Sequence, residues 1–170
     1  MAFACLPRTI GAMPYLIDGN NLLYALRNVA DYEAGRLGLC VLLKPLVARK
    51  ERVTIVFDGP DPPPGLLRQM YDQGVSVYFS GPYKADDLII GFIREDSAPK
   101  RLTVVSTDRE IRVEARKRRC IGRRSEEFVE FLARLHDRPG TRGGEPREKY
   151  RGLNSASQRD RWMRDLGFDP

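Results

Sequence analysis

The strongest structural signal in the sequence is the segment Tyr15-Leu16-Ile17-Asp18-Gly19-Asn20-Asn21-Leu22. Its first three residues have the length and the aromatic and β-branched composition of a strand. From Leu22 to Val29, apolar residues recur at helical spacing. Asp18 lies at the junction between the two patterns, so the segment predicts a strand that ends in a carboxylate and leads directly into a helix.

The same alternation of short apolar runs and amphipathic stretches continues to about Leu135. Strands are expected at 15–17, 53–57, 75–79 and 102–105, with a weaker one around 120–121. Helices are expected at 22–29, 37–47, 66–71, 88–93, 111–116 and 128–135. Nearly continuous apolar strands that alternate with helices indicate a parallel sheet covered on both faces. We therefore predict a three-layer α/β/α sandwich with a mainly parallel central sheet.

The composition divides the chain into three parts. Residues 1–13 show no period and are predicted to be a flexible N-terminal segment, followed by a domain at 14–135. Residues 136–170 contain Pro139-Gly140 and Gly143-Gly144 and few aliphatic residues, which is typical of an extended tail. Eight basic residues face three acidic ones between 138 and 164, a net charge of +5.

The overall charge also favours polyanions as partners. The 170 residues carry a formal net charge of +6, which does not by itself distinguish RNA from DNA or anionic lipid. Cys5, Cys40 and Cys120 are too scattered for a disulfide framework or a zinc knuckle. No apolar run approaches the roughly 20 residues of a membrane span, and the start lacks the pattern of a signal peptide. We expect a cytoplasmic protein without a membrane partner.

Carboxylates follow the principal predicted strands. Asp18 ends the first and Asp58 the second; Asp86 and Asp87 come shortly after the third, and Asp108 follows the fourth. The carboxyl ends of parallel strands meet at one edge of the sheet, where ligands bind. Close unpaired carboxylates repel by about 4 kcal/mol per pair at an effective dielectric constant near 20. A bound cation would remove that cost, and all-oxygen ligands suit Mg2+ or Mn2+.

Each aspartate also has an ordinary structural explanation. Aspartate before glycine, as at Asp18 and Asp58, is common in turns. Aspartates at a helix start are favoured by the helix dipole. Thr107 and Glu110 fit a capping box, which would place Asp108 in a first helical turn. These explanations do not account for four strands ending alike at one edge.

Other catalytic arrangements are disfavoured. His136, the one histidine, lies beyond the folded pattern, so a Ser-His-Asp or Cys-His arrangement is not available. The sequence contains no phosphate-binding loop with a following Lys-Ser/Thr and no dinucleotide-binding glycine motif. Metal-assisted hydrolysis of a phosphoryl group is therefore the catalytic chemistry that the sequence favours.

Four segments together resemble the YacP-like branch of NYN nucleases, within the PIN-like superfamily. They are Tyr15 to Leu22, Val53 to Gly59, Lys84-Ala85-Asp86-Asp87-Leu88-Ile89 and Val104 to Ile111. The resemblance runs from about 14 to about 135. It implies a PIN-like α/β/α sandwich, metal-dependent endoribonuclease activity with 5′-phosphate and 3′-hydroxyl products, and ribosome-linked cleavage of mRNA.

The resemblance also implies roles for individual residues. Asp18, Asp86 and Asp108 match the metal-binding catalytic positions, with Asp58 and Asp87 as auxiliary ligands. Four polar residues match positions that border the site and the phosphate: Asn20, Asn21, Ser106 and Thr107.

A basic stretch adds further candidates for substrate binding. Residues 112–124 hold seven Lys or Arg against one acidic residue, Glu114, a local net charge of +6. Such a run is often only a solvated face. An acidic site needs positive surroundings to attract RNA. We therefore expect Arg112 and Arg116, with Lys84, to contact phosphates.

The sequence thus predicts a metal-dependent endoribonuclease that acts on RNA with Mg2+ or Mn2+. The ribosome is a candidate partner. The alternative is a non-catalytic RNA- or ribosome-binding module of the same fold. A small-molecule phosphohydrolase is a third possibility, disfavoured because Asp18 is followed by Gly19-Asn20 and not by the x-Asp of an aspartyl-phosphate motif. The oligomeric state stays open.

Overall fold

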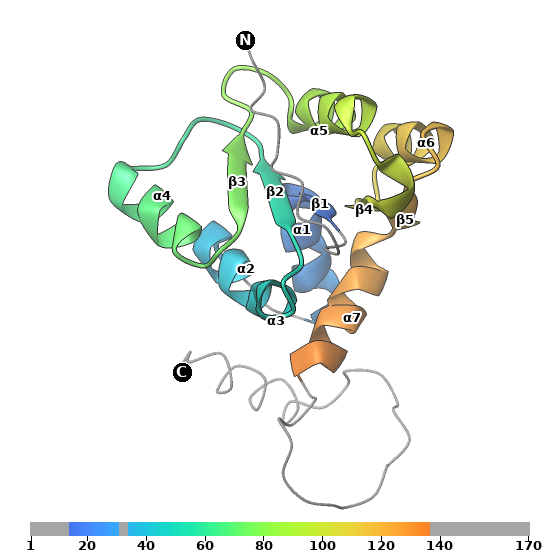
Figure 1. The fold of residues 1–170 in the computed structure, drawn as a ribbon. Helices are drawn as coiled ribbons and strands as arrows, with labels where there is room; N and C mark the ends of the chain where they lie inside the picture. Colours follow the sequence, from blue (N-terminus) through green and yellow to red (C-terminus); the bar gives the residue numbers. More distant parts are fainter. Residues whose placement is uncertain (1–13, 31–33, 137–170) are drawn as a thin grey trace, which may run out of the picture.

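The computed structural model describes residues 14–30 and 34–136. Its centre is a five-stranded sheet in which every strand pair is parallel, in the order β3-β2-β1-β4-β5 (Figure 1). The strands are β1 (Tyr15–Asp18), β2 (Val53–Phe57), β3 (Ser76–Phe79), β4 (Thr103–Val105) and β5 (Ile121–Arg123). All five lie where the sequence predicts strands, so the predicted parallel sheet is confirmed.

Helices cover both faces of the sheet. They are α1 (Gly19–Ala30), α2 (Arg36–Leu42), α3 (Lys44–Ala48), α4 (Pro64–Tyr71), α5 (Ala85–Glu95), α6 (Arg109–Lys117) and α7 (Ser125–His136), with a 3-10 turn, η1 (Pro99–Arg101). Residues of α1, α2, α3, α4 and α7 share one buried cluster with the sheet, and residues of α5 and α6 share the other. The protein is therefore a three-layer α/β/α sandwich, as predicted.

Alternation along the strands explains the two cores. Ile17 and Ile55 point into the cluster under α1 and α7, whereas Leu16 and Val56 point into the cluster under α5 and α6. All four side chains are at most 3% exposed, as expected for the interior strands of a parallel sheet. The edge strand β5 differs, because Ile121 and Gly122 are exposed.

One predicted element is wrong in its extent. The sequence pattern at 37–47 predicts a single helix, but the structure contains two, because α2 ends at Leu42 and α3 begins at Lys44. Pro45 lies in the first turn of α3. Proline in a helix interior lacks an N–H donor and clashes with the preceding turn, so it is placed at the start of a new helix. Apolar spacing alone did not reveal this break.

The strand order creates a switch point between β1 and β4. From β1 the chain first builds β2 and β3 on one side, then crosses to build β4 and β5 on the other. Ile17 of β1 is paired with Val105 of β4, so the next residues, Asp18 and Ser106, emerge side by side at the carboxyl edge. Ligands of open α/β sheets bind at this kind of position.

No helix among the described residues is long and apolar enough to span a membrane. The predicted N-terminal segment 1–13 lies outside the described residues, and so does the predicted tail 136–170 except for His136, which is the last residue of α7. The domain limits at 14 and 135 stay predictions.

Candidate active site

Asp18 is the buried carboxylate at the switch point. It ends β1 and is only 5% exposed. Its Oδ1 accepts a hydrogen bond from the Asn21 backbone N–H at 3.1 Å, and its Oδ2 accepts one from the Ser106 hydroxyl at 3.1 Å. The pKa of Asp18 is raised to about 6, mainly by burial and also by the charges of Asp86 and Asp108, and the two hydrogen bonds only partly oppose this rise. The fold thus holds this carboxyl group where its charge is unfavourable.

Ser106 connects Asp18 to Asp108. The fully buried Ser106 hydroxyl donates to Asp18 and accepts the Asp108 backbone N–H at 3.0 Å. The Asp108 side chain caps α6, because its Oδ1 accepts the N–H groups of Glu110 at 2.8 Å and Ile111 at 3.1 Å. Asp108 is the N-cap itself, so the capping box that the sequence suggested at Thr107 is not formed.

Thr107 belongs to a second network, which joins α1, β4 and α7. Its hydroxyl donates to Glu126 Oε2 at 2.9 Å and accepts the Ser125 N–H at 3.2 Å. Asn21 Oδ1 accepts the Thr107 N–H at 3.3 Å and the Ser125 hydroxyl at 3.1 Å. Asn21 therefore holds Asp18 through its backbone and the neighbouring loop through its side chain.

Asp86 and Asp87 lie in the first turn of α5, and Lys84 is the residue that precedes the helix. Asp86 is half-buried, whereas Lys84 and Asp87 are exposed. Burial raises the pKa of Asp86, and the charges of Asp108, Asp58, Asp87 and Glu110 raise it in turn. Asp86 is consequently the second carboxyl group whose ionisation is opposed by its surroundings.

Asp58 has a structural partner at the same edge. Its Oδ1 accepts the Ala85 N–H at 2.8 Å and the Ser80 hydroxyl at 3.2 Å. The side chain that follows β2 therefore anchors the start of α5, one residue before Asp86. From the sequence, Asp58 was interpreted as an auxiliary metal ligand or as a turn residue. In the structure its side chain also accepts a hydrogen bond from the first residue of α5, which neither interpretation predicted.

The predicted metal-binding carboxylates lie at one edge of the sheet, but they do not form a preformed metal site. Within residues 14–30 and 34–136, no group of three or more histidine, cysteine, aspartate or glutamate side chains is arranged to hold a metal ion. Asp86 and Asp108 are nevertheless close enough to Asp18 to raise its pKa. Mg2+ usually keeps several waters and is held directly by only one or two carboxylates. The oxygen donors therefore fit such an ion, although no three-carboxylate group is present.

The other predicted substrate-binding residues do not all lie at this edge. Asn20 is half-buried in the first turn of α1, directly after Asp18 and Gly19. Arg112 is half-buried near the start of α6, one turn after Asp108. Arg116 is on the same face of the helix. It is exposed in the last turn, however, where the chain has run back toward the opposite edge of the sheet.

Two residues of this edge were missed by the sequence analysis. Glu126 follows β5 and bonds Thr107, and hydrogen bonds from its own N–H and from Thr107 lower its pKa. Extending the rule of strand-end carboxylates to the weak fifth strand would have found it. Arg36 donates to the Asp58 carbonyl at 2.9 Å, and its guanidinium lies 5.5 Å from the Phe57 ring centroid and 5.3 Å from that of Phe79. No sequence pattern predicts this contact.

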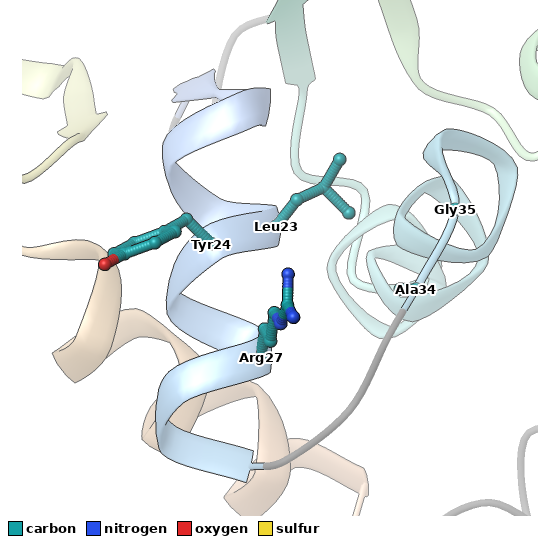
Figure 2. Close-up of a pocket in the computed structure, with 5 residues that line it drawn as sticks. All are labelled: Leu23, Tyr24, Arg27, Ala34 and Gly35. Atoms are coloured by element: carbon teal, nitrogen blue, oxygen red, sulfur yellow. The ribbon is translucent and has the colours of Figure 1, made fainter.

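A separate shallow pocket lies between α1 and the start of α2 (Figure 2). None of the predicted site residues lines it. Its lining residues are Leu23, Tyr24, Arg27, Ala34 and Gly35. The chemistry of the acidic edge does not extend to this pocket.

Comparisons with known proteins agree with this architecture. A family model described as the YacP-like NYN domain matches residues 15–164. The chain is similar in structure to a mutant of Rae1 (YacP) from Bacillus subtilis, with 18% sequence identity and a TM-score of 0.55. The alignment covers 72% of this chain and 76% of that one. No curated protein matches the sequence significantly.

Proposed function

Because this chain belongs to the YacP-like NYN domain family, a family of PIN-like nucleases, we propose that it is a metal-dependent endoribonuclease. The observation that supports this most is the buried Asp18 at the β1–β4 switch point, whose pKa is raised by burial and by Asp86 and Asp108. A protein gains no stability from gathering like charges in this way. Such a perturbed cluster at a ligand-binding edge is typical of a catalytic site.

We assign distinct roles to the acidic residues. Asp18, Asp86 and Asp108 would hold Mg2+ or Mn2+, with Asp87 and Asp58 in auxiliary positions. When bound, the cation would stabilise negative charge on the scissile phosphate and make a bound water more acidic.

The chain itself prepares the site in two ways. Asn21 and Ser106 fix both oxygens of Asp18, so this carboxylate need not reorganise when substrate arrives. Asp108 is held at the start of α6 through its Oδ1. The proposed contacts for the RNA backbone around these carboxylates are Asn20, Lys84, Thr107 and Arg112. Ser106 is fully buried and acts through Asp18, and Arg116 lies in the last turn of α6, away from these carboxylates.

RNA is the proposed substrate, and ribosome-linked cleavage of mRNA is the setting that we propose for the reaction. The net charge of +6 supports a polyanionic partner. The alternative function is a non-catalytic RNA- or ribosome-binding module of the same fold. This alternative differs from the proposed nuclease in one observable property: such a module would bind RNA without cleaving it.

Incubation with end-labelled single-stranded RNA tests the proposal. We expect cleavage with Mn2+ or Mg2+ and none with EDTA. Asp86→Asn should abolish cleavage, because it removes one charged ligand and leaves α5 in place. Asp72→Asn is the matched control, since Asp72 is an exposed aspartate that follows α4, outside the acidic edge.

Manganese binding, measured by calorimetry without RNA, provides a second readout. Asp86→Asn should weaken it and Asp72→Asn should not. RNA that is bound but uncut at every metal concentration would favour the non-catalytic module.

A further inference from the structure

The loop between β3 and α5 carries an exposed aromatic side chain beside the acidic edge. Tyr83 is 73% exposed, the residue after it is the exposed Lys84, and Asp86 lies two positions further on. Leaving a tyrosine ring in water forgoes the free energy of burying it. Nothing in the proposed chemistry of the carboxylates uses this ring.

Hydrogen bonds to the neighbouring β2–α4 loop hold this loop in place. The Ser80 N–H donates to the Phe57 carbonyl at 3.0 Å, and the Gly81 N–H donates to the Gly59 carbonyl at 2.9 Å. The Ser80 hydroxyl accepts the Gly59 N–H at 3.1 Å, and the Tyr83 N–H donates to the Ser80 carbonyl at 3.1 Å. Gly59 and Gly81 adopt positive φ angles of 92° and 61°, which glycine tolerates. Tyr83 therefore lies on a loop that hydrogen bonds to the neighbouring loop hold in place.

A second cation is fixed at the same pair of loops. Arg36 lies over the Phe57 and Phe79 rings and uses one N–H to bond the Asp58 carbonyl. A guanidinium has five N–H donors, so the remaining ones can bind an anion. Stacking on two rings orients the guanidinium plane before any ligand arrives.

An exposed ring next to a lysine, on a loop that is hydrogen-bonded to the loop that Arg36 contacts, is an arrangement suited to single-stranded nucleic acid. Aromatic side chains stack on bases, which are accessible in single strands and hidden in a duplex, while Arg and Lys bind the phosphates. Here the ring and both cations lie on the β2–β3 side of Asp18, whereas Arg112, near the start of α6, lies on the β4 side. A strand that contacts both sides would cross the acidic edge between them.

We propose that Tyr83, Lys84 and Arg36 form a nucleotide subsite for single-stranded RNA, in which Tyr83 stacks on an unpaired base and the two cations bind flanking phosphates. The proposal rests on RNA being the substrate of the acidic site, as proposed above. It adds that the RNA must be unpaired at one position beside the scissile bond.

Binding measured in EDTA separates this subsite from catalysis. We would titrate fluorescently labelled single-stranded RNA with the full-length protein and follow anisotropy. Tyr83→Ala should weaken binding about 5- to 150-fold, the range expected for loss of one base–aromatic stack. Tyr83→Phe keeps the ring and should bind within about twofold of the unchanged protein. Tyr24→Ala is the matched control, because Tyr24 is 68% exposed on α1.

Two further measurements identify what the subsite contacts. With a duplex RNA of the same length, Tyr83→Ala should change binding by less than twofold. Arg36→Gln should reduce the slope of log K against log salt by about 0.7, the value for one phosphate contact in a single strand. Thermal melts of each variant verify that it is folded.

The result that overturns the proposal is unchanged single-strand binding by Tyr83→Ala, or an equal loss in Tyr83→Phe. No RNA binding by the unchanged protein would overturn it as well. Because no metal is present, the outcome is independent of cleavage. If the protein fails to cut RNA but Tyr83→Ala weakens binding selectively for single strands, the subsite stands and the proposed enzymatic function fails.

Discussion

Asp18 illustrates, at the scale of one residue, how a buried carboxylate opposes the stability of the fold. Its oxygens accept two hydrogen bonds that favour the charged form, yet burial outweighs them and raises its pKa to about 6. The folded protein therefore keeps this proton to a higher pH than the unfolded chain does. From about pH 4 to about pH 6, the free energy of unfolding should fall as pH rises.

Asp18→Asn should consequently stabilise the metal-free protein at neutral pH. A pKa of about 6 in place of 3.8 corresponds to at most about 3 kcal/mol above pH 6. The asparagine amide can still accept the Asn21 N–H and can donate to the Ser106 hydroxyl, so packing is retained. Urea unfolding in EDTA at pH 4 and pH 7 measures the effect, which should be present only at pH 7.

Metal provides the control for this stability change. If a cation binds at Asp18, millimolar Mn2+ should stabilise the unchanged protein at pH 7 and should not stabilise the Asp18→Asn variant. A variant that is less stable than the unchanged protein at both pH values would mean that the carboxylate is well accommodated. The raised pKa would then be the wrong description of this residue.

Asn20 and Asn21 are adjacent residues with different expected roles. Asn21→Ala removes the acceptor of the Thr107 N–H and of the Ser125 hydroxyl, which is fully buried. Leaving buried donors without partners should lower the free energy of unfolding by about 1–3 kcal/mol. Asn20→Ala should leave stability nearly unchanged and weaken RNA binding. Parallel melts and titrations distinguish the two, and equal destabilisation by both substitutions would contradict the distinction.

At the scale of elements, the position of α5 depends on a residue that follows another strand. Asp58 accepts the N–H of Ala85 and so connects the end of β2 to the helix that carries Asp86. Helix caps of this kind contribute about 0.5–2 kcal/mol. The orientation of a proposed metal ligand is thus controlled from a neighbouring loop, and not by its own helix alone.

Two substitutions at Asp58 separate capping from metal binding. Asp58→Asn keeps the acceptor oxygen, so it should retain most of the stability and of the RNA cleavage. Asp58→Ala should cost about 1–2 kcal/mol of unfolding free energy and reduce cleavage, because the start of α5 loses its anchor. Denaturant unfolding and initial cleavage rates measure both. A loss of cleavage in Asp58→Asn as complete as in Asp86→Asn would instead make Asp58 a principal metal ligand and not an auxiliary one.

The elements that could be predicted from sequence are those defined by local pattern. Four strands appeared as short apolar runs and β5 only as a weak one, and the convergence of Asp18, Asp86 and Asp108 at one edge was predicted from the parallel order. The break at Pro45 was missed because apolar spacing continues across it. The roles of Asp58 and Arg36 could not be predicted, because each depends on contacts between loops that are distant in sequence.

At the scale of the whole molecule, the acidic edge has cations on two sides. Arg36 and Lys84 are on the β2–β3 side, and Arg112 is near the start of α6, which follows β4. The net charge of +6 attracts RNA from a distance, but only cations near the bound strand release counterions on contact. The salt dependence of binding can therefore separate local contacts from the overall charge.

Replacing Arg112 with glutamine should flatten the salt dependence of RNA binding. One lost phosphate contact reduces the slope of log K against log salt by about 0.7 for a single strand. The matched control is Arg49→Gln, because Arg49 is exposed between α3 and β2, toward the opposite edge of the sheet. Both variants change the net charge from +6 to +5, so long-range attraction falls equally. Titrations at several salt concentrations in EDTA should give a reduced slope only for Arg112→Gln. Equal slopes for the two variants would mean that α6 is a solvated face and that the RNA contacts the protein elsewhere.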